Sequence, residues 1–197
     1  AVLFPGPLLT NGNIAGEVLF MSMVPRAAVV MGSDSDLPVM QEAARILDEL
    51  GISSEVVISS AHRAPDKTAA YARSAVERGL AVIIAGAGGA AHLPGVIAAY
   101  TVLPVIGVPI ESGSLKGVDA LYAMVQMPAG VPVATMAING SRNAGILAAQ
   151  IIGVSDPAVR AGIAAYKDKL AKQVGEKDEQ LSEVGIGGYL ARPKEQR

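Results

Sequence analysis

Five short apolar runs, separated by helical patterns at regular spacing, limit the possible folds of this chain more than any other feature. Each run is nearly continuous and rich in β-branched residues, which is typical of strands buried on both faces of a parallel sheet. The runs occupy residues 26–31, 53–59, 80–86, 103–109 and 131–137. Because helical patterns alternate with these runs, the sequence predicts a doubly wound parallel sheet with helices on both faces.

The segments between the runs have the start and stop signals of helices. Residues 36–51 carry apolar side chains at helical spacing and end at Gly51, while residues 65–79 place Pro65 in the first turn. Residues 156–181 predict a long and more highly charged C-terminal helix. We therefore expect one α/β domain, a three-layer α/β/α sandwich of the flavodoxin-like kind, with a long C-terminal helix.

Two end segments are expected to lie outside this domain, which we place at residues 23–175. Residues 1–22 lack the basic start of a secretory signal, and Pro and Gly interrupt their apolar run. We expect them to form a poorly ordered N-terminal extension, and residues 176–197 to form a C-terminal tail.

The amino-acid composition limits which partners and which chemistry are compatible with this chain. Charged residues make up 17% of the chain, against about 25% in a typical soluble domain, and mean hydropathy is +0.40. Since no run of about 18 apolar residues occurs, we expect no membrane span and attribute the apolar excess to a homo-oligomer. The net charge of −2 argues against a nucleic-acid partner. The absence of Cys excludes thiolate chemistry and Cys-ligated zinc, and fits a cytoplasmic protein.

The carboxyl ends of the predicted strands are the expected ligand-binding edge of such a sheet. After the first strand, Gly32 is followed by Ser33, Asp34, Ser35 and Asp36, which lead into a helix. Free N–H groups at a helix start suit a phosphate, although Ser and Asp are also favoured as simple helix caps. The segment is neither a dinucleotide fingerprint nor a Walker loop, so neither kind of nucleotide site is indicated.

The loop after the second strand carries Ser60, His62 and Arg63 directly before Pro65. Arg offers a planar fork of donors to a phosphate, and His is the side chain that exchanges a proton near neutral pH. A solvated loop, with neither residue engaged in function, is the plainer alternative. The position at a strand's carboxyl end favours a functional role.

The loop after the third strand, "AGAGGAAHLPG", is thin because it consists of Gly and Ala up to His92. Glycines such as Gly86 and Gly88 allow a sharp bend or a close approach of a ligand to the backbone. His92 begins the next predicted helix, where a purely structural hydrogen bond is as good an interpretation as a functional role.

Three classes of protein place functional residues on loops of this kind. A phospho-acceptor receiver domain would need Asp at the end of the third strand and Lys after the fifth, where this chain has Gly86 and Asn139. A flavodoxin-like electron carrier is disfavoured because few aromatic residues are available to stack on a flavin. A cofactor-free enzyme acting on a phosphorylated small molecule would use all three loops together.

The motifs resemble a known family closely. In order, "MGSDSD", "SAHRAPD", "AGAGGAAHLPG", "VDALYAMVQMPAGVPVAT" and "NAGILAAQI" are similar to segments of the bacterial-type N5-carboxyaminoimidazole ribonucleotide mutases, over Val24 to Asp156. The resemblance implies an octamer that moves a carboxylate from the exocyclic nitrogen of a phosphorylated imidazole ribonucleotide to C4, in purine synthesis. It implies no metal, ATP or organic cofactor. Relatives that carboxylate aminoimidazole ribonucleotide with free CO₂ are the alternative.

The resemblance also implies roles for individual residues. His62 would act as general acid and then as base, Asp36 would bind ribose hydroxyls, and Arg63 would bind phosphate together with the serines. The remaining positions that the resemblance places around the substrate are Ser33, Ser35, Ser60, Ala87, Gly88, His92 and Leu93. The chain departs from many members at Ala64, where they have Thr, and at Ala129, where they have Arg.

Overall fold

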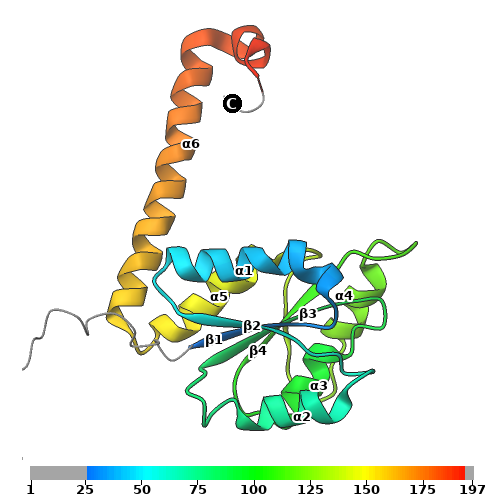
Figure 1. Ribbon diagram of the computed structural model, residues 1–197. Coiled ribbons are helices and arrows are strands. Elements are labelled where there is room, and N and C mark those ends of the chain that lie inside the picture. Colours follow the sequence, from blue (N-terminus) through cyan, green and yellow to red (C-terminus); the bar gives the residue numbers. More distant parts are fainter. Residues whose placement is uncertain (1–25, 194–197) are drawn as a thin grey trace, which may run out of the picture.

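The computed structural model describes residues 26–193 and contains one parallel sheet between two layers of helices (Figure 1). The strands are β1 (Ala27–Met31), β2 (Ser54–Ile58), β3 (Val82–Gly88), β4 (Val105–Ile110) and β5 (Ala134–Thr135). Their order in the sheet is β2-β1-β3-β4-β5, with every neighbouring pair parallel. The predicted doubly wound α/β/α fold is therefore confirmed. The expectation for residues 1–22 lies outside the described residues.

Side chains of the central strands alternate between the two helical layers. The helices are α1 (Leu37–Glu49), α2 (Pro65–Ser74), α3 (Leu93–Tyr100), α4 (Val118–Val125), α5 (Ser141–Gly153) and α6 (Pro157–Ala191), with a 3₁₀ turn η1 (Asp34–Asp36) before α1. In β1, Val29 packs with the core under α1 and α5, whereas Val30 packs with the core under α2, α3 and α4. Burial of both faces explains the continuous apolar runs in the sequence.

The two edge strands differ from the sequence prediction. Val56 and Ile58 of β2 are 49% and 47% exposed, so β2 is not buried on both faces. The pairing of β5 with β4 is confined to Ala134–Thr135, although residues 131–137 were predicted as a strand. Pro132 has no N–H to donate to a sheet ladder, which favours a short edge strand at this position.

The C-terminal helix α6 leaves the body of the molecule (Figure 1). Asp156 caps its start by accepting hydrogen bonds from the backbone of the first turn, and Val159 and Ile163 are its buried side chains. The helix continues to Ala191, with a break at Gly185, where φ is +64°. The helix is thus longer than predicted, and the expected tail boundary after residue 175 falls inside it. None of the helices within residues 26–193 has the length and apolarity needed to cross a membrane.

Candidate active site

The loops after β1, β2 and β3 surround a cleft of about 450 Å³ at the carboxyl edge of the sheet. The chain passes from β1 to β2 on one side and returns to β3 on the other, so this is the point where the strand order reverses. The residues that line the cleft are Gly32, Ser33, Ser35, Asp36, Ser60, Ala61, His62, Arg63, Ala87, Gly88, Gly89, Ala90, Leu93 and Ser112. The structure thus brings together all of the expected site residues except His92.

The loop after β1 is shaped by helix capping. Ser33 precedes η1, and its Oγ accepts a hydrogen bond from the Ser35 N–H at 3.3 Å. The capping role considered for this segment is therefore present in the structure. Burial raises the pKa of Asp36 above its ordinary value, against the opposing effect of hydrogen bonds from Ser35 and Ser33. This half-buried carboxyl group lies on the cleft wall, where it can accept hydrogen bonds from a ligand's hydroxyl groups.

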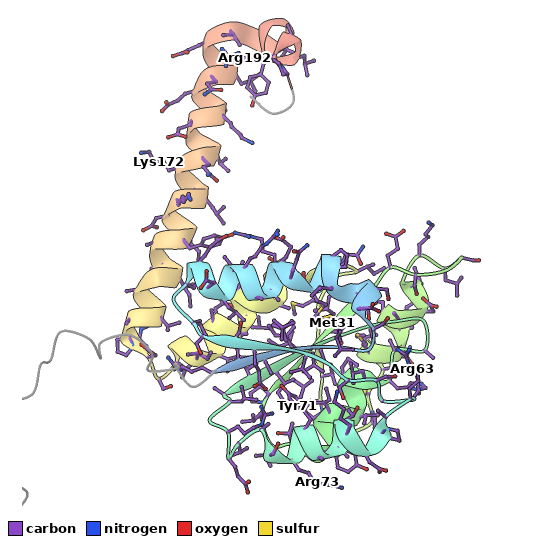
Figure 2. The ribbon with its side chains drawn as sticks, viewed as in Figure 1. Met31, Arg63, Tyr71, Arg73, Lys172 and Arg192 are labelled. Atoms are coloured by element: carbon purple, nitrogen blue, oxygen red, sulfur yellow. The ribbon has the colours of Figure 1, made fainter. Side chains whose placement is uncertain are left out.

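Arg63 connects the loops after β1 and β2. Its Nη2 donates to the Gly32 carbonyl at 2.8 Å, and its Nε donates to Ser60 Oγ at 3.4 Å. Within residues 26–193, Arg63 forms no salt bridge. Figure 2 shows Arg63 at the edge of the body away from α6. An oriented guanidinium that is not engaged in a salt bridge is suited to an anionic ligand such as a phosphate.

The loop that carries His62 is anchored beneath the cleft. Buried Ser59 shares a hydrogen bond of 2.9 Å with Thr68 of α2, and its N–H donates to the Met31 carbonyl at the end of β1. The Lys67 ammonium also donates to the Ile58 carbonyl at 2.9 Å. These contacts hold the loop against both β1 and α2, so the side chains that follow Ser59 start from a fixed backbone.

His62 and His92 are in direct contact. The Nε2 atom of His62 lies 2.8 Å from the Nδ1 atom of His92, and the rings meet edge to face with centroids 4.9 Å apart. His92 is the residue that precedes α3, and it lines a second hollow rather than the main cleft. The sequence contains no signal for this contact, because the two residues belong to loops after non-adjacent strands.

The Gly-Ala loop after β3 forms a wall of the cleft, and its thinness has a packing cause. A Cβ atom on Gly88 would lie 2.8 Å from Ser112 Oγ and 3.1 Å from the Ile110 carbonyl oxygen. Gly89 has φ of +60°, a conformation that side-chain-bearing residues rarely adopt. Ser112 itself follows β4 and was not among the expected site residues. The adjacency of β3 and β4 is the feature that brings it to this wall.

A metal site was not expected from the sequence. Within residues 26–193, no group of three or more His, Cys, Asp or Glu side chains is arranged to hold a metal ion. The polar groups that reach the cleft are instead hydroxyl, imidazole, guanidinium and carboxyl groups, together with the backbone of the Gly-Ala loop.

The fold and the cleft define a doubly wound α/β protein with a polar cleft at the switch in strand order. Residues 26–173 match the family described as AIR carboxylase, and the chain belongs to this family. It is 55% identical over 167 residues to the Thermotoga maritima protein named N5-carboxyaminoimidazole ribonucleotide mutase, covering 85% of this chain and 98% of that protein. A Mycobacterium tuberculosis protein of the same name is 56% identical over 168 residues, covering 85% and 95% of the two chains.

A solved structure of a similar protein is consistent with the family found from the sequence relatives. The crystal structure of Treponema denticola PurE superposes with a TM-score of 0.73 at 28% sequence identity, covering 80% of this chain and 98% of that one. The family resemblance predicted from the sequence motifs is confirmed by these comparisons.

Proposed function

We propose that this chain is an N5-carboxyaminoimidazole ribonucleotide mutase, an isomerase of de novo purine synthesis. It converts the N5-carbamate of aminoimidazole ribonucleotide into 4-carboxy-5-aminoimidazole ribonucleotide. The observation that carries the proposal is the cleft itself, which combines His62 and Arg63 with a side-chain-poor wall. The high identity to proteins of this name supports the same activity.

The substrate's phosphate binds to Arg63 and the neighbouring hydroxyl groups in this proposal. Arg63 is already oriented by Gly32 and Ser60, so little side-chain freedom is lost when the phosphate arrives. Ser33 and Ser35 add hydroxyl groups on the facing loop, and Asp36 accepts hydrogen bonds from the ribose. The flat imidazole ring then lies along the backbone of Ala87 and Gly88.

His62 performs the proton transfers. Protonated His62 gives its proton to the exocyclic nitrogen as the C–N bond of the carbamate breaks and its electron pair returns to nitrogen, which releases CO₂. The aminoimidazole is an enamine, so its C4 attacks CO₂ and forms the new C–C bond. Neutral His62 then removes the proton from C4, which restores the aromatic ring and returns His62 to its protonated form. No proton or electron is consumed overall.

Released CO₂ must stay beside the ring for the second half of the reaction. The wall from Ala87 to Ala90 bears no side chain larger than a methyl group, so the backbone can approach the ring closely. Leu93 adds an apolar surface to the same cleft. Keeping CO₂ within contact distance and excluding water make the recapture an effectively intramolecular step.

We also propose that the working form is a cytoplasmic homo-octamer. Apolar side chains such as Val102, Tyr122 and Val174 are 91%, 60% and 67% exposed in the single chain, which suits burial between copies. Native mass spectrometry tests the assembly. A mass near eight chains of 20.1 kDa is expected, and a 20.1 kDa monomer would contradict it.

The activity is tested by supplying each candidate substrate separately at low CO₂. We expect rapid conversion of the carbamate and slow conversion of aminoimidazole ribonucleotide, because the enzyme carries its own CO₂ from one atom to the other. The alternative is a carboxylase that uses free CO₂, in accordance with the description of the family as AIR carboxylase. Efficient turnover of aminoimidazole ribonucleotide with bicarbonate, and none of the carbamate, would establish the carboxylase instead.

A further inference from the structure

The contact between the two histidines determines which nitrogen of His62 is free. A hydrogen bond of 2.8 Å between two imidazole nitrogens needs an N–H on one ring and a lone pair on the other. Within residues 26–193, the Nδ1 atom of His62 and the Nε2 atom of His92 have no hydrogen-bond partner. One nitrogen of His62 is thus engaged by His92, and the other remains available to a ligand in the cleft.

His92 contacts His62 from outside the cleft. It lines a separate hollow of about 330 Å³, whose walls are otherwise formed by Ala91, Gly95, Val96, Ala99, Ala123, Met127, Pro128 and Val131. None of these residues carries a carboxylate that would neutralise a positive charge on His92. The titratable groups that share the main cleft with His62 are Asp36 and Arg63. Because the contact needs a lone pair on one of the two nitrogens, at most one of the two rings can be protonated while the hydrogen bond persists.

The backbone of His92 is held firmly enough to orient another side chain. Its N–H donates to the Ala90 carbonyl at 2.8 Å, and its carbonyl accepts the Val96 N–H at 2.9 Å as the first turn of α3 forms. The next two residues, Leu93 and Pro94, are buried in the core. His92 therefore starts from a fixed point at the end of a packed helix.

The proton chemistry proposed for His62 selects one arrangement of the pair. Protonated His62 carries a proton on both nitrogens, so its Nε2–H must donate and His92 Nδ1 must accept. If neutral His62 keeps the proton on Nε2, the same hydrogen bond persists in both halves of the reaction. The opposite tautomer would require the hydrogen bond to reverse its direction each time His62 loses a proton.

We propose that His92 is a positioning residue that fixes the tautomer of His62. Neutral His92 accepts a hydrogen bond from His62 Nε2–H through its Nδ1 atom, so that His62 Nδ1 is the nitrogen that exchanges the proton with the substrate. This inference rests on the proposed function for the role of His62. The tautomer itself is a property of the free protein and can be measured without substrate.

The first test is ¹⁵N NMR of the full-length protein labelled at histidine. The chain contains only two histidines, so the imidazole spectrum shows just these two rings, and a His92→Asn variant assigns them. At a pH where both rings are neutral, we expect His62 and His92 each to carry the proton on Nε2. A His62 ring with its proton on Nδ1, or in equal exchange between the two nitrogens, would overturn the proposal.

The second test separates hydrogen-bond acceptance from simple packing. His92→Leu removes the acceptor, and we expect kcat to fall about 10- to 100-fold with KM nearly unchanged, because His62 loses its fixed tautomer and orientation. His92→Asn offers an amide oxygen in place of Nδ1, and it should restore most of the lost kcat. Equal losses in both variants, no loss in either, or a change in KM alone would overturn the proposal.

The same set of proteins distinguishes a folding defect in a variant from a failure of the proposed function. Native mass and circular dichroism show whether each variant assembles, and the spectrum of the unsubstituted protein decides the tautomer if His92→Leu does not fold. An unsubstituted protein that is inactive on the carbamate would contradict the proposed function. A His62 proton on Nδ1 in an active protein would contradict only the role of His92.

Discussion

The loops after β2 and β3 contrast sharply although both border the same cleft. Ser60, His62 and Arg63 follow β2, so that loop carries the imidazole and the guanidinium group that line the cleft. Residues 86–91, at the end of β3 and directly after it, carry nothing larger than a methyl group. The contrast indicates a division of labour in which one loop supplies reactive groups and the other supplies space for the ring and for CO₂.

The largest effect is expected from removing the proton-transfer group of the reactive loop. His62→Asn should lower kcat by about 10²- to 10⁴-fold, the range usually contributed by general acid–base catalysis. Steady-state kinetics with the carbamate measures the loss, and calorimetry with the product tests whether binding survives. A variant that keeps more than a tenth of the turnover, while remaining folded, would assign the proton transfers to another group.

A methyl group on the wall should be nearly as damaging as a change on the reactive loop. In Gly88→Ala the new Cβ would lie 2.8 Å from Ser112 Oγ, and moving the wall should lower kcat about 100-fold. Adding Ser112→Gly should restore part of the activity, since it clears the nearest contact. Gly162→Ala on α6 is the matched control, because nothing lies within 4 Å of its added carbon. If Gly88→Ala is as active as this control, the thin wall is not required.

A smaller effect is expected from the anion-binding group of the reactive loop. Arg63→Ala should raise KM about 10- to 150-fold, which corresponds to the roughly 1.5–3 kcal/mol of a hydrogen bond to a charged group. Arg63→Lys should recover only part of this, because Lys lacks the planar fork. Substrate-saturation kinetics distinguishes the outcomes. A fall in kcat at constant KM would place Arg63 at the reacting atoms rather than at the phosphate.

The smallest effect is expected from a contact between β2 and α2, the two elements that flank the reactive loop. The Tyr71 hydroxyl donates to Glu55 Oε1 at 2.5 Å, and Arg78 pairs with the same carboxylate (Tyr71 is labelled in Figure 2). Tyr71→Phe should lower the free energy of unfolding by about 1 kcal/mol and leave kcat unchanged. Urea unfolding at fixed protein concentration measures the first quantity. A large loss of activity would mean that this network positions the loop directly.

The difference in stability between the unsubstituted protein and Tyr71→Phe should change with pH in a definite direction. Burial, with the Glu55 carboxylate beside it, raises the pKa of Tyr71 well above its ordinary value of 10.0 in the folded protein. The contribution of Tyr71 is therefore complete below about pH 10 and declines as pH rises beyond that value, because the unfolded chain loses its proton first. The stability difference between the unsubstituted protein and Tyr71→Phe should shrink above pH 10. A difference that grows with pH would contradict this environment.

The sequence predicts the centre of the fold better than its edges, for physical reasons. β1, β3 and β4 are buried on both faces, so their apolar runs identify them directly. At β2 and β5 the same apolar pattern does not reveal that one side lacks a neighbouring strand. The predicted end of the C-terminal helix at residue 181 was also too early, since the chain remains helical to Ala191, with a break at Gly185, although only Val159 and Ile163 of this helix are buried.

The site was predictable to the extent that it depends on strand ends. His62, Arg63 and the Gly-Ala loop could be located because parallel strands present their carboxyl ends at one edge. Ser112 could not, since its position depends on how the loop after β4 packs over Gly88. The His62–His92 contact depends on two side-chain rotamers in loops 30 residues apart, which no local sequence pattern encodes.

The most direct test of the division between the two loops is a crystal structure of the His62→Asn variant with the carbamate bound. We expect the phosphate on Arg63, the imidazole ring against the backbone of Ala87 and Gly88, and the carbamate within reach of residue 62. A nucleotide bound in this pose would support separate roles for the reactive loop and the wall. A ring bound away from the Gly-Ala loop, or a phosphate without contact to Arg63, would contradict them.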